Sequence, residues 1–191
     1  LMDVSFKTTV PKLKNVLSAS ELSIPESLTF DSYNKVLSGS SYFLNDYQIG
    51  EIIDHADGVT VTESEHVMAT RLWQNTAKVH FDTTARSDGR RLIYGGHVIS
   101  MARALSFNGL ANMQIIAAIN SGSHANPCFA GDTIYAWSEV LDTAQTRIPS
   151  IGAIRLRLVA TKGAVGLLRD ENNTYYDDIF LDLDYWAFVP I

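Results

Sequence analysis

The apolar positions of residues 96–107 predict a buried helix near the middle of the chain. The segment reads Gly-His-Val-Ile-Ser-Met-Ala-Arg-Ala-Leu-Ser-Phe, and Arg103 is its one residue certain to carry a charge. A helix that is apolar nearly all round is usually enclosed by other elements of the fold. The Asn108-Gly109 pair that follows is typical of a helix C-cap, so we expect the helix to end there.

Alternating apolar and polar positions predict antiparallel strands after this helix. The predicted strands cover residues 113–120, 132–141, 154–161 and 179–189. Ser121-Gly122-Ser123 and Pro127 break or bulge the first strand, and residues 163–175 form a loop before the last one. A sheet that curls around a central helix buries both, so the pattern predicts an α+β domain over residues 45–191.

The segment before the buried helix is predicted to hold a turn, a short strand and a second helix. Asp57-Gly58 is a turn signal, and residues 59–62 alternate as a strand should. Thr62 is followed three residues later by Glu65, and this capping box predicts the start of a helix over about residues 63–74.

Residues 1–44 carry a weaker pattern and are predicted to be an N-terminal extension or linker. Residues 1–9 alternate loosely and favour a strand, and residues 27–37 favour a short helix before a Gly-Ser-Ser break. The chain opens with Leu1 and not with methionine. We therefore expect the sequence to begin inside a longer gene product.

Composition and charge argue against some classes of binding partner for the protein. The formal net charge of -6 argues against nucleic acid or an anionic membrane surface as the main partner. No apolar run approaches the length of a membrane span, and the N-terminus lacks the pattern of a signal peptide. Cys128 is the single cysteine, so no intrachain disulfide can form, and a reducing, cytoplasmic location fits.

Two short motifs beside the buried helix are candidates for chemistry. Asn75 and His80 precede the helix, and Gly95 and Gly96 lie where it should begin. Free backbone N–H groups at a helix N-terminus can stabilise negative charge that develops on an oxygen. An imidazole nearby can move a proton next to a carbonyl group. The structural alternatives are a loop histidine at position 80 and tight packing at the glycines.

Several further polar residues have two open interpretations. Arg90 and Arg91 either bind a substrate carboxylate in bidentate fashion or remain solvated in a loop. His97 either lies near a pocket or packs against another element. His124 either lines the pocket or is solvated at a strand end. Asp132 is expected to cap a turn, and the spacing of the remaining acidic and histidine residues fits no zinc site.

The chain resembles the MaoC-like family of hotdog-fold hydratases. In that family an Asp-x4-His motif is followed by a Gly-Gly-x-Ile/Val helix start and a Pro-x3-Gly-Asp-Thr turn. The matching segments here are residues 75–80, 95–98 and 127–133. Longer matches to the C-terminal half of the mesaconyl-CoA hydratase group, also called β-methylmalyl-CoA dehydratases, extend the resemblance over residues 45–191. They cover residues 74–81, 90–97, 104–112, 129–141 and 181–186.

This resemblance implies a hotdog fold, in which an antiparallel sheet wraps around a long central helix, and an acyl-CoA hydro-lyase. The implied reaction is the reversible hydration of a short, branched, dicarboxylic 2-enoyl-CoA such as mesaconyl-CoA. CoA arrives with the substrate, and no metal or redox cofactor is implied. His80 is expected to activate water, Asn75 to orient the water or the imidazole, and the Gly96 N–H to hold the thioester oxygen. The expected substrate-binding residues are Arg90, Arg91, Tyr94, Gly95, His97 and His124.

The chain also departs from the family's pattern. Asn75 stands where most members have an aspartate, although the mesaconyl-type group resembles this chain in that respect. The resembling enzymes hold two hotdogs in one chain, and this sequence matches the second, with residues 1–9 as a candidate for the last strand of the first. We therefore expect a homodimer or pairing with an upstream half. A hotdog thioesterase and a non-catalytic acyl-CoA or acyl-carrier binding module remain as alternatives.

Overall fold

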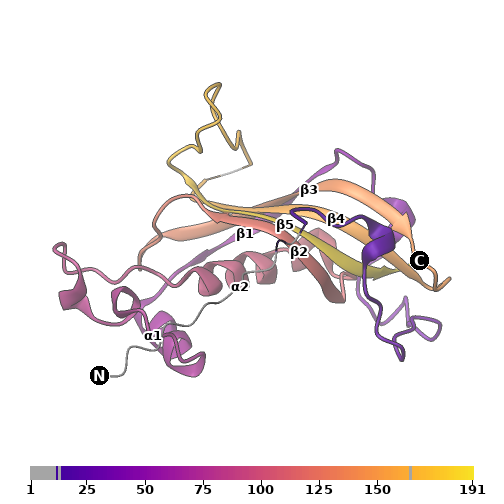
Figure 1. Ribbon diagram of the computed structural model, residues 1–191, viewed down its shortest axis with the longest axis horizontal. Coiled ribbons are helices and arrows are strands. Elements are labelled where there is room, and N and C mark those ends of the chain that lie inside the picture. Colours follow the sequence, from indigo (N-terminus) through magenta and orange to yellow (C-terminus); the bar gives the residue numbers. More distant parts are fainter. Residues whose placement is uncertain (1–11, 13, 164) are drawn as a thin grey trace.

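A five-stranded antiparallel sheet curves over one long helix (Figure 1). The structure is a computed structural model, and it describes residues 12, 14–163 and 165–191. The strands are β1 (Ile52–Thr60), β2 (Ile115–His124), β3 (Thr133–Gln145), β4 (Ile151–Thr161) and β5 (Ile179–Pro190). The helices are α1 (Glu63–Leu72), α2 (Gly95–Leu105) and α3 (Phe107–Leu110), with 3-10 turns at Ala19–Glu21, Leu44–Asp46, Lys78–His80 and Thr83–Ala85. The predicted α+β class is confirmed.

The strands lie in the order β1-β3-β4-β5-β2, and each neighbouring pair is antiparallel. β1 and β2 are therefore the two edges of the sheet. The four strands predicted after the helix are confirmed, and β3 extends four residues further than expected. Side-chain alternation explains the agreement, because Ile134, Ala136 and Val140 of β3 lie in the core whereas Tyr135 between them is exposed.

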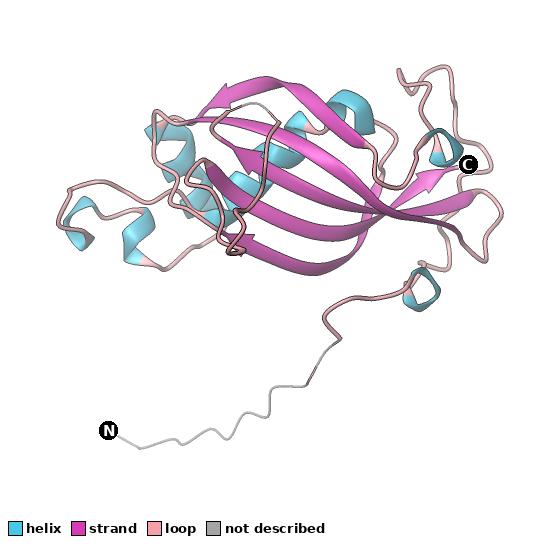
Figure 2. Ribbon diagram, turned by 90° about the horizontal axis from the view of Figure 1, so that it is seen from above, coloured by secondary structure: helices cyan, strands magenta, loops and turns pink. Residues whose placement is uncertain are grey.

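The face of the sheet toward α2 forms the main hydrophobic core. Val98 and Met101 of α2 pack there with Leu156 of β4 and Leu183 of β5. Seen from above, α2 crosses beneath the strands (Figure 2). Ser100 on the other side of α2 is exposed, so the helix is buried along one face only. The prediction of a helix enclosed all round was wrong for the described residues, because small and apolar residues on its outer side are left uncovered.

The opposite face of the sheet is covered in part by the N-terminal segment. Ile24 is buried against Trp186 and Phe188 of β5. The indole N–H of Trp186 donates a hydrogen bond of 2.9 Å to the carbonyl oxygen of Leu17. The described part of the predicted linker therefore packs on the sheet.

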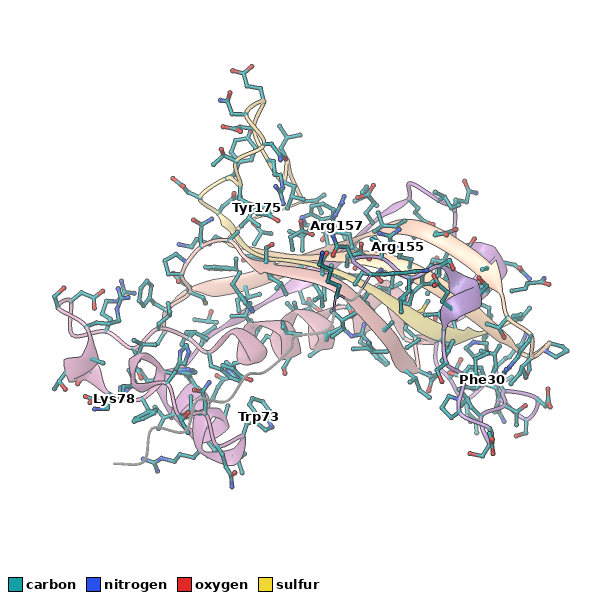
Figure 3. The ribbon with its side chains drawn as sticks, in the orientation of Figure 1. Phe30, Trp73, Lys78, Arg155, Arg157 and Tyr175 are labelled. Atoms are coloured by element: carbon teal, nitrogen blue, oxygen red, sulfur yellow. The ribbon has the colours of Figure 1, made fainter. Side chains whose placement is uncertain are left out.

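Ion pairs connect neighbouring strands on this same outer face. Arg155 Nη2 of β4 lies 2.5 Å from Asp184 Oδ2 of β5, and Arg157 Nη1 lies 2.6 Å from Glu139 Oε2 of β3. Figure 3 shows both arginines on the side of the sheet away from α2, below the loop that carries Tyr175. Each guanidinium thus has a carboxylate partner on the next strand.

The segment that leads into α1 matches its prediction closely. The side chain of Thr62 accepts the backbone N–H of Glu65, and the Glu65 carboxylate accepts the backbone N–H of Thr62 at 3.1 Å. This reciprocal capping box is confirmed. The helix ends at Leu72, two residues earlier than expected, and Gln74 takes a positive φ of 51°.

Two local predictions were wrong. Residues 27–37 form turns and no helix, because the side chain of Asn34 accepts the N–H groups of Val36 and Leu37 and so favours a turn. Asp57-Gly58 lies inside β1 and does not end a strand. The pairing of β1 with β3 shifts register between Asp54 and Gly58, so the turn signal marks a bulge.

Three further expectations concern strand ends and termini. Ser121-Gly122-Ser123 neither breaks nor bulges β2, since these residues pair in regular register with β5 and the strand continues to His124; the register shifts lie earlier, between Ile116 and Ala118 and between Ile119 and Ser121. Gly109 has a φ of +97° and follows α2 closely, as expected for a helix stop. The strand expected at residues 1–9 lies outside the described residues. None of the helices in the described ranges has the length and apolar character needed to cross a membrane.

Candidate active site

The N-terminus of α2 is built from Tyr94, Gly95 and Gly96. Tyr94 is the N-cap residue, and its carbonyl oxygen accepts the backbone N–H of His97 at 2.9 Å. The next two N–H groups, those of Gly95 and Gly96, belong to the first turn, where a helix has no internal acceptor to offer. Such groups can stabilise an anionic oxygen.

Close packing explains why both residues before His97 are glycines. A Cβ atom on Gly95 would lie 2.4 Å from Nε2 of His124, and one on Gly96 would lie 2.6 Å from the ring of Tyr94. Neither distance is compatible with a methyl group. The two glycines thus allow an imidazole and a phenol ring to approach the helix end directly.

His80 is held by its own backbone neighbourhood. It ends the 3-10 turn Lys78–His80, and its Nδ1 lies 2.8 Å from the carbonyl oxygen of Leu92. Because a carbonyl oxygen can only accept, Nδ1 carries the proton. Nε2 of the neutral ring is therefore the nitrogen with a free lone pair. The ring centroid lies 5.7 Å from that of Tyr94, so His80 and the start of α2 are close neighbours.

A cavity of about 690 Å³ lies beside this helix end and is lined mainly by apolar groups. Five residues predicted for the site border it, namely His80, Tyr94, Gly95, Gly96 and His124. The remaining lining comes from Leu92, Ile93, Val98, Ile99, Ala125, Asn126, Pro127, Cys128 and Phe180. The cavity has the size of an ordinary small-molecule site.

Burial shifts the pKa values of two titratable side chains that line this cavity. Desolvation lowers the pKa of His124 below its usual range. Burial, reinforced by Asp132, raises the pKa of the Cys128 thiol to about 12. Cys128 is therefore protonated at neutral pH and is unsuited to act as a nucleophile.

Asn75 does not border this cavity. Its side-chain oxygen accepts the backbone N–H of Ala77 at 2.9 Å, and its own N–H donates to the carbonyl oxygen of Thr70. The residue borders a separate hollow of about 320 Å³ beside Phe81. Its amide thus fixes the turn that leads from α1 into the segment with His80.

Arg90 and Arg91 also lie outside the cavity lining. Arg91 Nη1 is 2.8 Å from Glu63 Oε2, and its Nε donates to the carbonyl oxygen of Phe81. The Arg90 guanidinium lies over the ring of Phe129, 3.8 Å from its centroid. Arg91 therefore ties the loop to α1, and Arg90 is stacked beside the segment that enters the cavity wall.

The contacts of His97 and Asp132 are those of residues that stabilise the fold. His97 is 7% exposed and faces α1, with Nε2 3.5 Å from Glu65 Oε1. Its surroundings match the packing alternative. Asp132 accepts the N–H of Phe129 at 2.8 Å, so its prediction as a turn cap is confirmed. Within residues 12, 14–163 and 165–191, no three His, Cys, Asp or Glu side chains gather as metal ligands would.

His66 was not predicted from the sequence. It is fully buried on α1, and its Nε2 accepts the backbone N–H of Tyr94 at 2.9 Å. Its ring lies near those of His80 and His97, at centroid distances of 6.3 and 5.9 Å. The only sequence signal was a histidine on the inner side of a predicted helix, which does not reveal a contact with a residue 28 positions later.

Comparisons with known proteins give close relatives. No family model matches the chain. It is 63% identical over 184 residues to a mesaconyl-CoA hydratase of Cereibacter sphaeroides, across 95% of this chain and 54% of that protein. It is 50% identical over 193 residues to a β-methylmalyl-CoA dehydratase of Chloroflexus aurantiacus, across 96% of this chain and 54% of that one. The chain thus spans about half the length of these curated relatives.

Solved structures agree with the sequence relatives. A crystal structure described as a putative MaoC domain protein dehydratase from Chloroflexus aurantiacus matches with a TM-score of 0.83 and 47% identity, over 98% of this chain and 55% of that one. A Mycobacterium tuberculosis protein described as a double hotdog fold matches with a TM-score of 0.58 and 20% identity, over 90% of this chain and 48% of that one, and supports the fold alone.

The sheet order, the helix beneath it and these neighbours define a hotdog fold, and the chain is similar to the solved structure described as a putative MaoC domain protein dehydratase. Its close homologues are the proteins named mesaconyl-CoA hydratase and β-methylmalyl-CoA dehydratase. The predicted fold and the predicted resemblance are both confirmed.

Proposed function

We propose that the chain catalyses the reversible addition of water to a short, branched, dicarboxylic 2-enoyl-CoA thioester such as mesaconyl-CoA. The names of its two close homologues support this reaction and this substrate. The observation that carries the proposal is the position of His80 beside the start of α2, at one mainly apolar cavity. CoA is part of the substrate, and no further cofactor takes part.

In the proposed hydration, Nε2 of His80 takes a proton from water as the water oxygen bonds to the β-carbon. The electrons of the double bond move toward the α-carbon and the thioester oxygen. The N–H of Gly96 and the positive end of α2 stabilise the enolate oxygen that forms. The imidazolium of His80 then returns its proton to the α-carbon. One water is added, and the imidazole ends neutral as it began.

Asn75 takes an indirect part in this proposal. Its amide oxygen holds the Ala77 N–H and thereby shapes the turn before His80. An aspartate at the same position could accept the same N–H, so either residue can support the turn. Because an amide cannot act as a base, the proton transfers belong to His80.

Recognition of the acyl group is proposed for residues on both sides of the helix end. Tyr94, Gly95 and His124 border the cavity and contact the thioester and its acyl chain. Arg90 is the better of the two arginines for a free carboxylate, since Arg91 is already paired with Glu63. Stacking on Phe129 leaves the edge of the Arg90 guanidinium available for such a contact.

The test is to incubate the purified chain with mesaconyl-CoA, follow the loss of enoyl-thioester absorbance, and weigh the product by mass spectrometry. A gain of one water supports the proposal. Release of free CoA identifies a thioesterase instead. An intact thioester that nevertheless binds supports the remaining alternative, a non-catalytic acyl-CoA binding module.

A further inference from the structure

His66 occupies an unusual position for a residue that the proposed mechanism does not use. It has no solvent exposure, and it lies in the first half of α1. Its Nε2 accepts the backbone N–H of Tyr94 at 2.9 Å. Tyr94 comes directly before α2, so its N–H is the first of the helix-end groups that have no acceptor within the helix. This helix end is the one that the proposed reaction uses.

The hydrogen bond fixes the protonation of His66. A backbone N–H can only donate, so Nε2 must offer a lone pair and Nδ1 must carry the single ring proton. Burial lowers the pKa of His66 to about 4, and the nearby His97 and His80 add to the effect. The ring is therefore neutral near pH 7, and the bond to Tyr94 persists.

The Tyr94 residue is consequently held at both ends. His66 binds its N–H, while its carbonyl oxygen accepts the N–H groups of His97 and Val98 in the first turn. Gly95 and Gly96 have no side chains through which they could be held. Their N–H groups therefore depend on the residues on either side for their direction.

His66 also contacts the second part of the site. Its ring meets that of His80 edge to face, with centroids 6.3 Å apart and an interplanar angle of 85°. A single buried ring thus touches the imidazole that moves the proton and bonds to the helix end that receives the negative charge. A small displacement between two such groups can lower the rate of a reaction by about a hundredfold.

We propose that His66 is a positioning residue, whose buried imidazole sets the N-terminus of α2 at a fixed place relative to His80. This inference rests on the proposed hydratase function for its effect on rate. Its structural part, the bond from Tyr94 N–H to His66 Nε2, is testable without any reaction.

Three variants separate the acceptor from the ring. In His66→Gln the side-chain oxygen reaches about as far as Nε2 and can accept the Tyr94 N–H. In His66→Asn the oxygen reaches only as far as Nδ1, and in His66→Leu no acceptor remains. Thermal unfolding and gel filtration establish which variants are folded, and only those are compared.

The kinetic readout is kcat and KM for hydration of mesaconyl-CoA. We expect His66→Leu and His66→Asn to lower kcat by about ten- to a hundredfold with KM within about threefold of wild type. His66→Gln should recover kcat to within about threefold. A folded His66→Leu variant with the wild-type kcat overturns the proposal, and so does a His66→Gln variant as slow as His66→Leu.

A second readout uses NMR of the 15N-labelled chain. The imidazole spectrum of the wild type should show the proton of His66 on Nδ1, and the Tyr94 amide should exchange slowly with solvent. Exchange should remain slow in His66→Gln and become at least tenfold faster in His66→Leu. If the wild type does not hydrate the thioester, the proposed function fails, and this exchange measurement still decides the role of His66. Unchanged exchange in His66→Leu overturns it.

Discussion

His80 is tethered through one nitrogen and free at the other. The bond from Nδ1 to the Leu92 carbonyl fixes both the tautomer and the direction of the ring. Under the proposed mechanism Nε2 is the atom that moves protons. The same bond would be made by a purely structural histidine, so the distinction between the two roles must come from rates.

Replacing this histidine is expected to remove the proton transfer. His80→Ala should lower kcat for hydration by about 10² to 10⁴, the usual contribution of a positioned general base. Steady-state kinetics on mesaconyl-CoA would measure it. Lys78→Ala is the matched control, because Lys78 is exposed in the same 3-10 turn (Figure 3) and should retain the wild-type rate. Near-normal turnover of His80→Ala would remove His80 from the mechanism.

The buried histidines predict how stability depends on pH. Burial lowers the pKa of His55, His66 and His97 below the ordinary value of 6.5. The unfolded chain therefore binds more protons than the folded one below pH 6.5. The contribution of these histidines to stability is complete above that pH and is lost as the pH falls toward the pKa values of the folded state.

Urea unfolding at pH 7.5, 6.5, 5.5 and 5.0 would measure this loss. The free energy of unfolding should fall between pH 6.5 and 5.0, a window above the range of the carboxylates. In His66→Gln the same fall should be shallower, because one buried imidazole no longer takes up a proton on unfolding. Equal slopes for the two proteins would contradict this explanation.

At the scale of elements, the start of α2 depends on the absence of two side chains. A methyl group at position 95 would collide with the imidazole of His124, which must then leave the helix end. We expect Gly95→Ala to lower kcat/KM at least tenfold while the protein still folds, since alanine suits the helix itself. Gly163→Ala is the control, because a Cβ atom there meets nothing within 4 Å. Equal rates for both variants would show that His124 adapts without consequence.

The elements differ in how well the sequence predicted them. β3, β4 and β5 alternate in sequence over long stretches, and this local pattern is enough to predict strands. Nearly every residue of β4 and β5 is nevertheless buried, because the outer face of the sheet is covered as well. Residues 27–37 were mistaken for a helix because the Asn34 side chain accepts two backbone N–H groups and so favours turns there. The sequence of β1 and β2 predicted turns or breaks inside strands that in fact continue past irregular pairing. Pairing with a partner strand decides whether a strand continues, and the sequence does not show that pairing.

In the candidate site too, the local motifs were predicted and the long-range contacts were not. His80, Gly95 and Gly96 were predicted because their motif is short and local, and the fold brings them to one cavity. The bond from Tyr94 to His66 was missed, since it joins residues 28 positions apart. The expectation that Arg91 faces a substrate could not foresee its ion pair with Glu63 on α1. Long-range packing, which one sequence does not display, sets these outcomes.

At the scale of the whole molecule, the edge strand β2 exposes several large apolar side chains. Along β2, Ile115, Ile116 and Ile119 are 38, 41 and 59% exposed. An apolar, unpaired edge is a template for another strand. We therefore expect the isolated chain to pair with a second copy through this edge, as a substitute for the other half of its longer relatives.

Sedimentation across a range of concentrations would test this pairing. The wild type should sediment as a dimer, and Ile119→Lys should shift it toward the monomer. Ile52→Lys is the control, because Ile52 is 48% exposed on the opposite edge strand, β1. A dimer that survives Ile119→Lys but not Ile52→Lys would place the interface on the other edge.

The strand order has a consequence for how the chain is made. β5 is the final strand in sequence, yet it lies between β4 and β2 in the sheet. β2 is synthesised before β3 and β4 but has no partner in its own sheet until residues 179–190 have left the ribosome. Its isoleucines stay unpaired throughout that interval, when strand edges are most prone to wrong association. The edge formed by β2 must therefore wait for the last strand, whereas β1, β3 and β4 can pair before it, and a chain that ended before Leu181 would leave β2 without a partner in its own sheet.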